Sequence, residues 1–300
     1  MVTDAAYAAC LHVARGHYEN FPVASWLMPR HMRPHIAAVY AFARTADDFA
    51  DEGRAPADVR IAQLDDWAHR LHEAAAGRPP KDDEHQAVFV AIAETIRSCG
   101  LDVGLFDDLL SAFRQDVTTT RYETWEELLD YCRRSASPIG RLVLRVAGYR
   151  EPALAVASDA VCTALQLTNF WQDLERDWMK GRLYVPLSLV RAHGADERDL
   201  ERREMSPAWR AVLAEVVART RTLFRSGRSV ADGVSGRLRW ELRATWLGGA
   251  RILDRLEAAN FDGFRQRPTL GFGDALPLVW RTLRWKAGTL GHPAIGPLGQ

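Results

Sequence analysis

Four polar side chains recur at helical spacing in the second half of the chain. They are Gln166, Asn169, Asp173 and Asp177. A helix would place them along one face, and the mainly apolar residues before them predict that this helix is largely buried. Buried carboxylates need a compensating partner, and Asn and Asp oxygens without neighbouring cysteine or histidine suit a hard cation such as Mg²⁺. The alternative is a solvated acidic face whose carboxylates pair with Arg176 or Lys180.

A second acidic cluster lies in the first half of the chain. It consists of Asp47, Asp48 and Asp51, and it follows the apolar run 36–42. Carboxylates are disfavoured at the C-terminal end of a helix, and like charges one turn apart repel each other by about 0.2–0.5 kcal/mol. A bridging cation would remove both penalties. We therefore expect two buried helices that end in carboxylates and face each other across a metal and phosphate site.

Composition limits the classes of partner. The 300 residues carry 39 basic and 39 acidic side chains, so no net charge favours nucleic acid. Cys10, Cys99, Cys132 and Cys162 have no CxxC spacing and are expected to be reduced thiols in a cytoplasmic protein. The sequence shows no signal peptide and no apolar run long enough to span a membrane, which leaves peripheral contact with the inner membrane as an option.

The hydrophobic periodicity predicts helices throughout and no alternating strand pattern. The expected helices cover 3–16, 34–52, 57–76, 85–98, 103–116, 125–146, 152–179, 206–227, 236–259 and 274–287. We predict an all-α single domain over residues 1–290, a helical bundle around a central apolar cavity, and a frayed tail over 291–300. Within 125–146, Pro138 is expected to kink the helix, and Gly140 permits close approach of another helix.

The order of these motifs resembles the squalene/phytoene synthase family. The resemblance rests on Tyr40-Ala-Phe-Ala-Arg44, on Asp47-Asp-Phe-Ala-Asp51, on the Gln166 to Asp177 row, and on Gly181-Arg-x-Tyr-x-Pro186. It covers roughly residues 5 to 268 and implies the all-α isoprenoid synthase fold. In that fold the two acidic helices hold Mg²⁺ ions, about two or three together with the substrate diphosphate.

The resemblance also implies roles for individual residues. The metal-side residues would be Asp47, Asp48, Asp51, Asn169, Asp173 and Asp177. Arg44 and Arg182 would contact the diphosphate, because guanidinium groups suit phosphate oxygens. Tyr131 would bond to the departing diphosphate, and these three residues would form the catalytic set. Further substrate contacts would come from Tyr40, Asn20, Gln166 and Tyr184.

Departures from the family pattern favour one branch of it. The first diphosphate loop reads Tyr18-Glu-Asn-Phe21, and Gln172, Arg176 and Gly249 stand where other residues are common. These changes suggest a reworked diphosphate region that grips a single diphosphate. Three stretches resemble the bacterial hydroxysqualene synthase branch of hopanoid biosynthesis: Glu19-Asn-Phe-Pro-Val-Ala-Ser25, Asn169-Phe-Trp-Gln-Asp173 and Phe264-Arg-Gln-Arg-Pro268. The resemblance implies that presqualene diphosphate is ionised and the rearranged cation is quenched by water, without NADPH. Asn20, Gln166 and Tyr131 remain equal candidates for positioning that water.

Two other functions remain open. The chain could instead condense two prenyl diphosphates, as presqualene diphosphate, squalene or phytoene synthases do. It could also be a non-catalytic assembly protein of the same fold, although the intact aspartate motifs argue against this. Under the preferred interpretation, the functional partners would be a presqualene diphosphate synthase and an oxidoreductase that processes hydroxysqualene.

Overall fold

The computed structural model describes residues 2–16, 27–51, 55–81, 84–265 and 267–286. Within these residues the secondary structure is helical, with one isolated bridge and no strand, so the predicted all-α fold is confirmed. The helices are α1 (Val2–Gly16), α2 (Arg33–Asp51), α3 (Ala57–Ala75), α4 (Gln86–Cys99), α5 (Gly104–Thr118), α6 (Trp125–Ser135), α7 (Ser137–Val146), α8 (Pro152–Gln172), α9 (Leu174–Met179), α10 (Leu187–Ala192), α11 (Glu197–Glu201), α12 (Pro207–Gly227), α13 (Val230–Gly233), α14 (Gly236–Ala258) and α15 (Phe272–Leu283).

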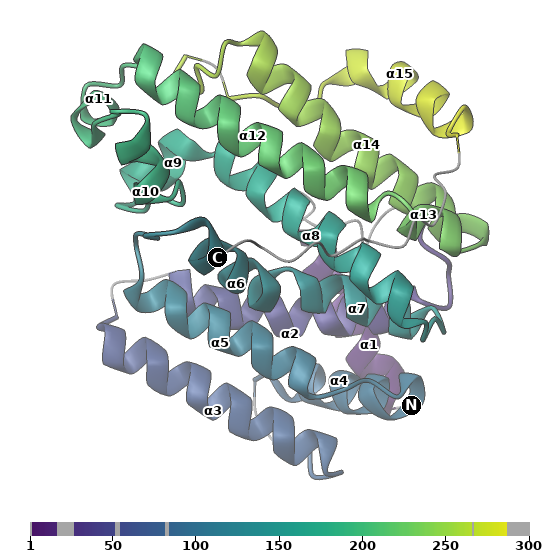
Figure 1. Cartoon of the computed structure of the whole chain (residues 1–300). Helices are drawn as coiled ribbons and strands as arrows, with labels where there is room; N and C mark the ends of the chain where they lie inside the picture. The colour runs from purple at the N-terminus through teal and green to yellow at the C-terminus, as the bar shows by residue number, and fades with distance from the viewer. Residues whose placement is uncertain (1, 17–26, 52–54, 82–83, 266, 287–300) are drawn as a thin grey trace.

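Helix α8 runs through the middle of the bundle (Figure 1). It packs against α12 and α14 on one side and against α6 and α7 on the other. Helices α1, α3, α4 and α5 surround α2, and α15 lies along α14. The buried apolar residues form one cluster that extends from Ala6 to Phe264. No helix in the described part of the chain is both long and apolar enough to cross a membrane.

Local sequence signals explain where several helices begin and end. Thr124 caps α6 by accepting a hydrogen bond from the backbone N–H of Glu127, and Ser206 caps α12 in the same way through Trp209. Proline fits the first turn of α8 and of α12 because no helical hydrogen bond is lost there. Gly100 ends α4 in the left-handed conformation, with φ of 60°.

Two predicted helices are interrupted. The helix predicted over 125–146 divides at Ala136 into α6 and α7, and Pro138 lies in the first turn of α7, so the proline accompanies a break instead of a kink. The helix predicted over 152–179 divides at Asp173, whose φ and ψ are −103° and 16°. The short helices α10, α11 and α13 were not predicted, because four to six residues carry too little periodicity.

Glycines allow the helices around α8 to approach closely. A Cβ at Gly140 would lie 2.3 Å from Ser158 Oγ and 2.5 Å from Cys162 Sγ, which confirms the close approach predicted for this residue. At Gly227 the obstacle is backbone, because a Cβ would lie 2.6 Å from the carbonyl oxygen of Ala157. These contacts position α8, which carries the second acidic motif.

We expect Gly227→Ala to destabilise the protein by about 1–3 kcal/mol, because the backbone of α8 cannot move aside for the new methyl group. Urea unfolding followed by circular dichroism measures this change. Gly273→Ala is the matched control, since Gly273 lies in α15 with open space around it. Equal stability of the two variants would show that α8 and α12 are not held at this distance by Gly227.

Candidate functional site

The C-terminal ends of α2, α5 and α8 lie at the same end of the bundle (Figure 1). The loops that follow α5 and α9 are joined there by a parallel bridge between Arg121 and Leu183. The N–H of Leu183 donates to the carbonyl oxygen of Thr120 at 2.9 Å, and Arg121 Nη1 donates to the carbonyl of Gly181 at 2.7 Å. This loop clamp fixes the backbone of Arg182 beside the end of α5.

Arg182 follows the second acidic motif in the chain and contacts the first one. Its Nη2 donates to Asp51 Oδ1 at 2.6 Å and to the carbonyl oxygen of Asp116 at 3.2 Å. Lys180 Nζ lies 3.8 Å from Asp51 Oδ2. The chain segment after the second motif therefore contacts the first motif directly, which agrees with the expectation that the two acidic helix ends face each other.

The first acidic cluster is partly neutralised by its own helix. Arg44 Nη1 lies 3.3 Å from Asp47 Oδ2, and Nη2 lies 2.5 Å from Asp48 Oδ1. Desolvation, followed by the negative charge of Asp51, raises the pKa of Asp47 to about 6. Tyr40 lies one turn before Arg44 and is half-buried, and desolvation raises its pKa.

The second acidic motif has a partner far along the chain. Arg267 holds Asp173 with two hydrogen bonds, Nε to Oδ1 at 2.6 Å and Nη2 to Oδ2 at 2.9 Å. Desolvation, and then the charge of Asp173, raises the pKa of Asp177 to about 7. Asn169 is exposed and Gln166 is half-buried on α8. Asn20 lies outside the described residues.

Asp116 is a site residue that the sequence analysis did not select. It is buried at the end of α5, and its Oδ2 accepts a hydrogen bond from the Tyr131 hydroxyl at 2.9 Å, whereas its buried Oδ1 has no partner among the described residues. Desolvation raises the pKa of Asp116 to about 7. The sequence does contain a signal for Asp116. Like Asp47 and Asp51, it follows an apolar helical run and lies at the C-terminal end of its helix, where the helix dipole disfavours a carboxylate.

An aromatic group lies next to these carboxylates. Tyr184 stacks face to face on Phe170, with ring centroids 3.7 Å apart and an interplanar angle of 6°. Tyr131 lies against both rings and against Tyr122. Burial raises the pKa of Tyr131 and of Tyr184, so both phenols are neutral and can donate hydrogen bonds. The structure thus brings Tyr131, Tyr184 and the end of α5 together.

The carboxylate oxygens at this site fit a hard cation whose coordination shell is completed by a further ligand. Within the described residues, no three acidic, histidine or cysteine side chains converge closely enough to hold a metal ion by themselves. The raised pKa values of Asp47 and Asp177 and the unpartnered Oδ1 of Asp116 show desolvated oxygens that a cation would stabilise. Mg²⁺ typically takes one or two carboxylates and completes its shell with water and phosphate oxygens.

The three residues that depart from the family pattern, Gln172, Arg176 and Gly249, make the following contacts. Gln172 Nε2 donates to the carbonyl oxygen of Pro268 at 2.5 Å, which holds the segment carrying Arg267 against α8. Arg176 Nη1 lies 3.7 Å from Asp173 Oδ1. A Cβ at Gly249 would lie 2.6 Å from the ring of Phe224 and 2.7 Å from Leu165, so the packing excludes a larger residue there.

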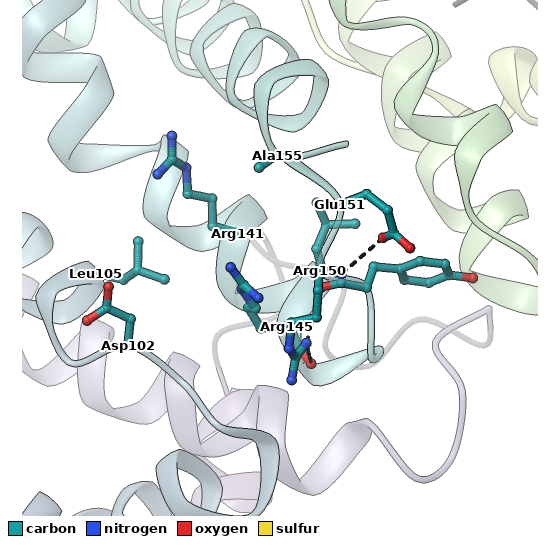
Figure 2. A pocket seen from close by; sticks show the side chains of 9 residues that line it. Asp102, Leu105, Arg141, Arg145, Arg150, Glu151 and Ala155 are labelled. Carbon is teal, nitrogen blue, oxygen red and sulfur yellow. Dashed lines mark hydrogen bonds between the residues drawn. The ribbon is translucent and has the colours of Figure 1, made fainter. Parts of the chain in front are cut away.

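An arginine-rich cavity lies elsewhere, between α7 and the start of α8 (Figure 2). It measures about 90 Å³ and is bordered by Arg141, Arg145 and Arg150. Arg141 pairs with Asp159 at 2.5 Å, and Arg150 donates to backbone carbonyls, including that of Cys99. Arg141 and Arg150 are thus bonded within the protein, where they join α7 to α8 and the α7–α8 loop to the end of α4, away from the acidic site.

We expect the substitution Asp116→Asn to change how stability depends on pH. The pKa of Asp116 is about 7 in the fold, against about 3.9 in an unfolded chain, so the folded protein binds this proton more tightly. Native stability therefore falls as pH rises through this window, and the neutral amide removes that loss. The unfolding free energy of the variant relative to wild type should rise by on the order of 2 kcal/mol between about pH 5 and pH 8.

Urea unfolding at several pH values measures this difference. Asp108→Asn is the control, because Asp108 lies on the same helix and is accessible to solvent. Parallel pH profiles for wild type and Asp116→Asn would show that the buried carboxyl does not titrate in this range.

Comparison with known proteins identifies the family. The squalene/phytoene synthase family model matches residues 14–274. A hydroxysqualene synthase of Zymomonas mobilis is 41% identical over 75% of this chain and 74% of its own length, and one of Rhodopseudomonas palustris is 41% identical over 81% and 80%. The crystal structure of squalene synthase HpnC from Alicyclobacillus acidocaldarius superimposes with a TM-score of 0.80 at 39% identity, covering 86% of this chain and 95% of that one. The chain therefore belongs to the squalene/phytoene synthase family.

Proposed function

We propose that the protein is a Mg²⁺-dependent hydroxysqualene synthase. It would ionise presqualene diphosphate, allow the cyclopropylcarbinyl cation to rearrange, and quench the product cation with water. The observation that supports this proposal is the contact of Arg182, in the segment after the second acidic motif, with Asp51 of the first motif and with the carbonyl oxygen of Asp116. The names of the relatives reported above support the choice of substrate.

The metal-side residues in this proposal are those of the two acidic motifs. They are Asp47, Asp48, Asp51, Asn169, Asp173 and Asp177. When bound, Mg²⁺ would supply Lewis-acid stabilisation of the charge that develops on the leaving diphosphate. Asp116 is a further oxygen donor, because its Oδ1 is buried and has no partner among the described residues.

The arginines would bind the diphosphate. Arg44 and Arg182 pair with motif aspartates in the structure, at 2.5 Å to Asp48 and 2.6 Å to Asp51. A cation on these carboxylates would compete with the guanidinium groups, which could then form bidentate contacts with phosphate oxygens. Tyr131 would donate a hydrogen bond to the departing diphosphate; this role is supported by its neutral hydroxyl, which donates to Asp116 in the structure.

The aromatic residues would protect the carbocation. The stacked rings of Phe170 and Tyr184 lie against Tyr131, whose hydroxyl donates to Asp116, and aromatic rings attract a cation while offering no strong nucleophile. Water then adds to the rearranged cation, its oxygen forms the new C–O bond, and the released proton is taken up by the diphosphate. Because this quench needs no hydride, the proposal requires no NADPH.

Further residues would contact the substrate. Tyr40 on α2 and Gln166 on α8 are half-buried and are proposed as such contacts, and Asn20 in the first loop is a further proposed contact.

The reaction would be a carbon–oxygen lyase step instead of a prenyl transfer. A presqualene diphosphate synthase would supply the substrate, and an oxidoreductase would consume the hydroxysqualene. Such an apolar product also makes peripheral contact with the inner membrane useful for an enzyme in the cytoplasm.

Product analysis by mass spectrometry tests the proposal. Purified protein with Mg²⁺ should convert presqualene diphosphate to hydroxysqualene without added NADPH, and a chelator should stop the reaction. Farnesyl diphosphate supplied alone should remain unchanged. Consumption of farnesyl diphosphate with presqualene diphosphate left intact would instead indicate a prenyl transferase.

Arg182→Gln should lower kcat/KM for presqualene diphosphate by about 10²–10³-fold, because it removes a charge placed at the developing anion. Arg191→Gln is the matched control: Arg191 also follows the second motif but pairs with the exposed Glu123. Steady-state kinetics on both variants measures the difference, and circular dichroism verifies folding. If both variants retain wild-type kinetics, Arg182 does not bind the diphosphate.

A further inference from the structure

Helix α15 presents its apolar residues to the solvent. We call the following residues the α15 stripe: Phe272, Leu276, Val279, Trp280 and Leu283. Their spacing of four, three, one and three places them on one helical face. Exposure is 82% for Leu276 and 60% for Leu283, values that are unusual for leucine in a folded protein.

The inward side of α15 is mainly polar. Asp274 and Thr282 are buried against the bundle, with Leu278 half-buried between them. Asp274 accepts hydrogen bonds from Arg251 Nε at 2.9 Å and from Arg255 Nη2 at 2.5 Å on α14. Rotating α15 to bury the stripe would break these bonds, so ion pairs hold the apolar face outward. A surface helix in water normally buries its apolar face and exposes its polar face, and α15 does the opposite.

Basic and aromatic side chains border the end of the stripe. Arg228, Arg281, Arg284 and Lys286 surround a cleft of about 330 Å³ together with Trp246, Trp280 and Trp285. The guanidinium carbon of Arg228 lies 3.7 Å from the ring centroid of Trp285, and that of Arg284 lies 4.0 Å from Trp280. Between residues 267 and 286 the only acidic residue is the buried Asp274, and Asp232 accepts a hydrogen bond from Trp285 at the border. The four basic residues of the border outnumber this one acid, so the surface carries positive charge.

We infer that α15 binds an anionic lipid bilayer, with the α15 stripe inserted below the headgroups and the basic border on the lipid phosphates. Positive charge next to an apolar face matches the negative surface of such a membrane. Trp246 and Trp285 at the border suit the headgroup level, where an amphipathic ring is stable. Twelve residues give a helix only about 18 Å long, so α15 lies in the membrane plane and does not cross it.

A second copy of the chain fits this surface less well. A two-fold contact between two stripes would bring the arginines and lysines of two basic borders together, and this repulsion costs binding energy. Figure 1 shows α15 at the edge of the bundle on α14, where a flat surface can reach it. This inference does not depend on the proposed reaction, since lipid binding is measured without substrate.

Co-sedimentation with lipid vesicles tests the inference. The full chain should bind vesicles with about one-third phosphatidylglycerol and bind pure phosphatidylcholine vesicles at least about fivefold more weakly. Val279→Glu should weaken binding to the anionic vesicles by at least about tenfold, because it places a carboxylate in the inserted face. Val156→Glu is the matched control, since Val156 is 59% exposed and Val279 is 57% exposed.

A second variant tests the charge separately. Arg281→Gln combined with Arg284→Gln should lose about fivefold in affinity per removed charge and should bind with less sensitivity to salt. All variants should keep the wild-type melting temperature within a few degrees, because the altered side chains are exposed.

Three results would overturn the inference. The first is that wild type fails to bind anionic vesicles, and the second is that Val279→Glu binds as well as Val156→Glu. The third is a dimer in analytical ultracentrifugation that Val279→Glu dissociates, which would assign the stripe to a second copy. A chain truncated after Lys286 should also bind the anionic vesicles. If only the truncated chain binds and the full chain does not, residues 287–300 cover the stripe and the inference fails for the full chain.

Discussion

The site depends on one electrostatic constraint: carboxylates at the ends of desolvated helices must be neutralised. Asp47, Asp116 and Asp177 all have pKa values raised by burial, and each lies close to at least one other acid. Three arginines neutralise part of this negative charge through ion pairs: Arg44 on α2, Arg182 after α9 and Arg267 after α14. The loop clamp and the glycine contacts of α8 serve to hold these opposite charges at bonding distance.

Much of this arrangement was readable from the sequence because it is local or periodic. The main helices follow from the spacing of apolar residues, and the acids of both motifs stand out because they follow apolar helical runs. The contact between the motifs could be expected, since two groups of buried acids need shared compensation. Gly140 was recognised as a packing position because glycine at mid-helix usually has such a reason.

Other features depend on pairs that sequence spacing does not connect. Arg267 reaches Asp173 across 94 positions, and Tyr131 on α6 reaches Asp116 on α5 across the loop between these helices. The break at Asp173 also has no local signal, because neither glycine nor proline marks it. α15 was expected as an ordinary last helix; its reversed polarity becomes visible only once Arg251 and Arg255 are seen to hold Asp274 inward.

The loop clamp has a consequence for the speed of ligand exchange. Because the backbone on both sides of Arg182 is fixed to the segment after α5, Arg182 can change partners by side-chain rotation alone. Rotamer changes of partly exposed side chains occur in picoseconds to nanoseconds, whereas loop and domain closure takes microseconds to milliseconds. Exchange of partners at Arg182 therefore needs no loop or domain closure, which is the slower class of motion.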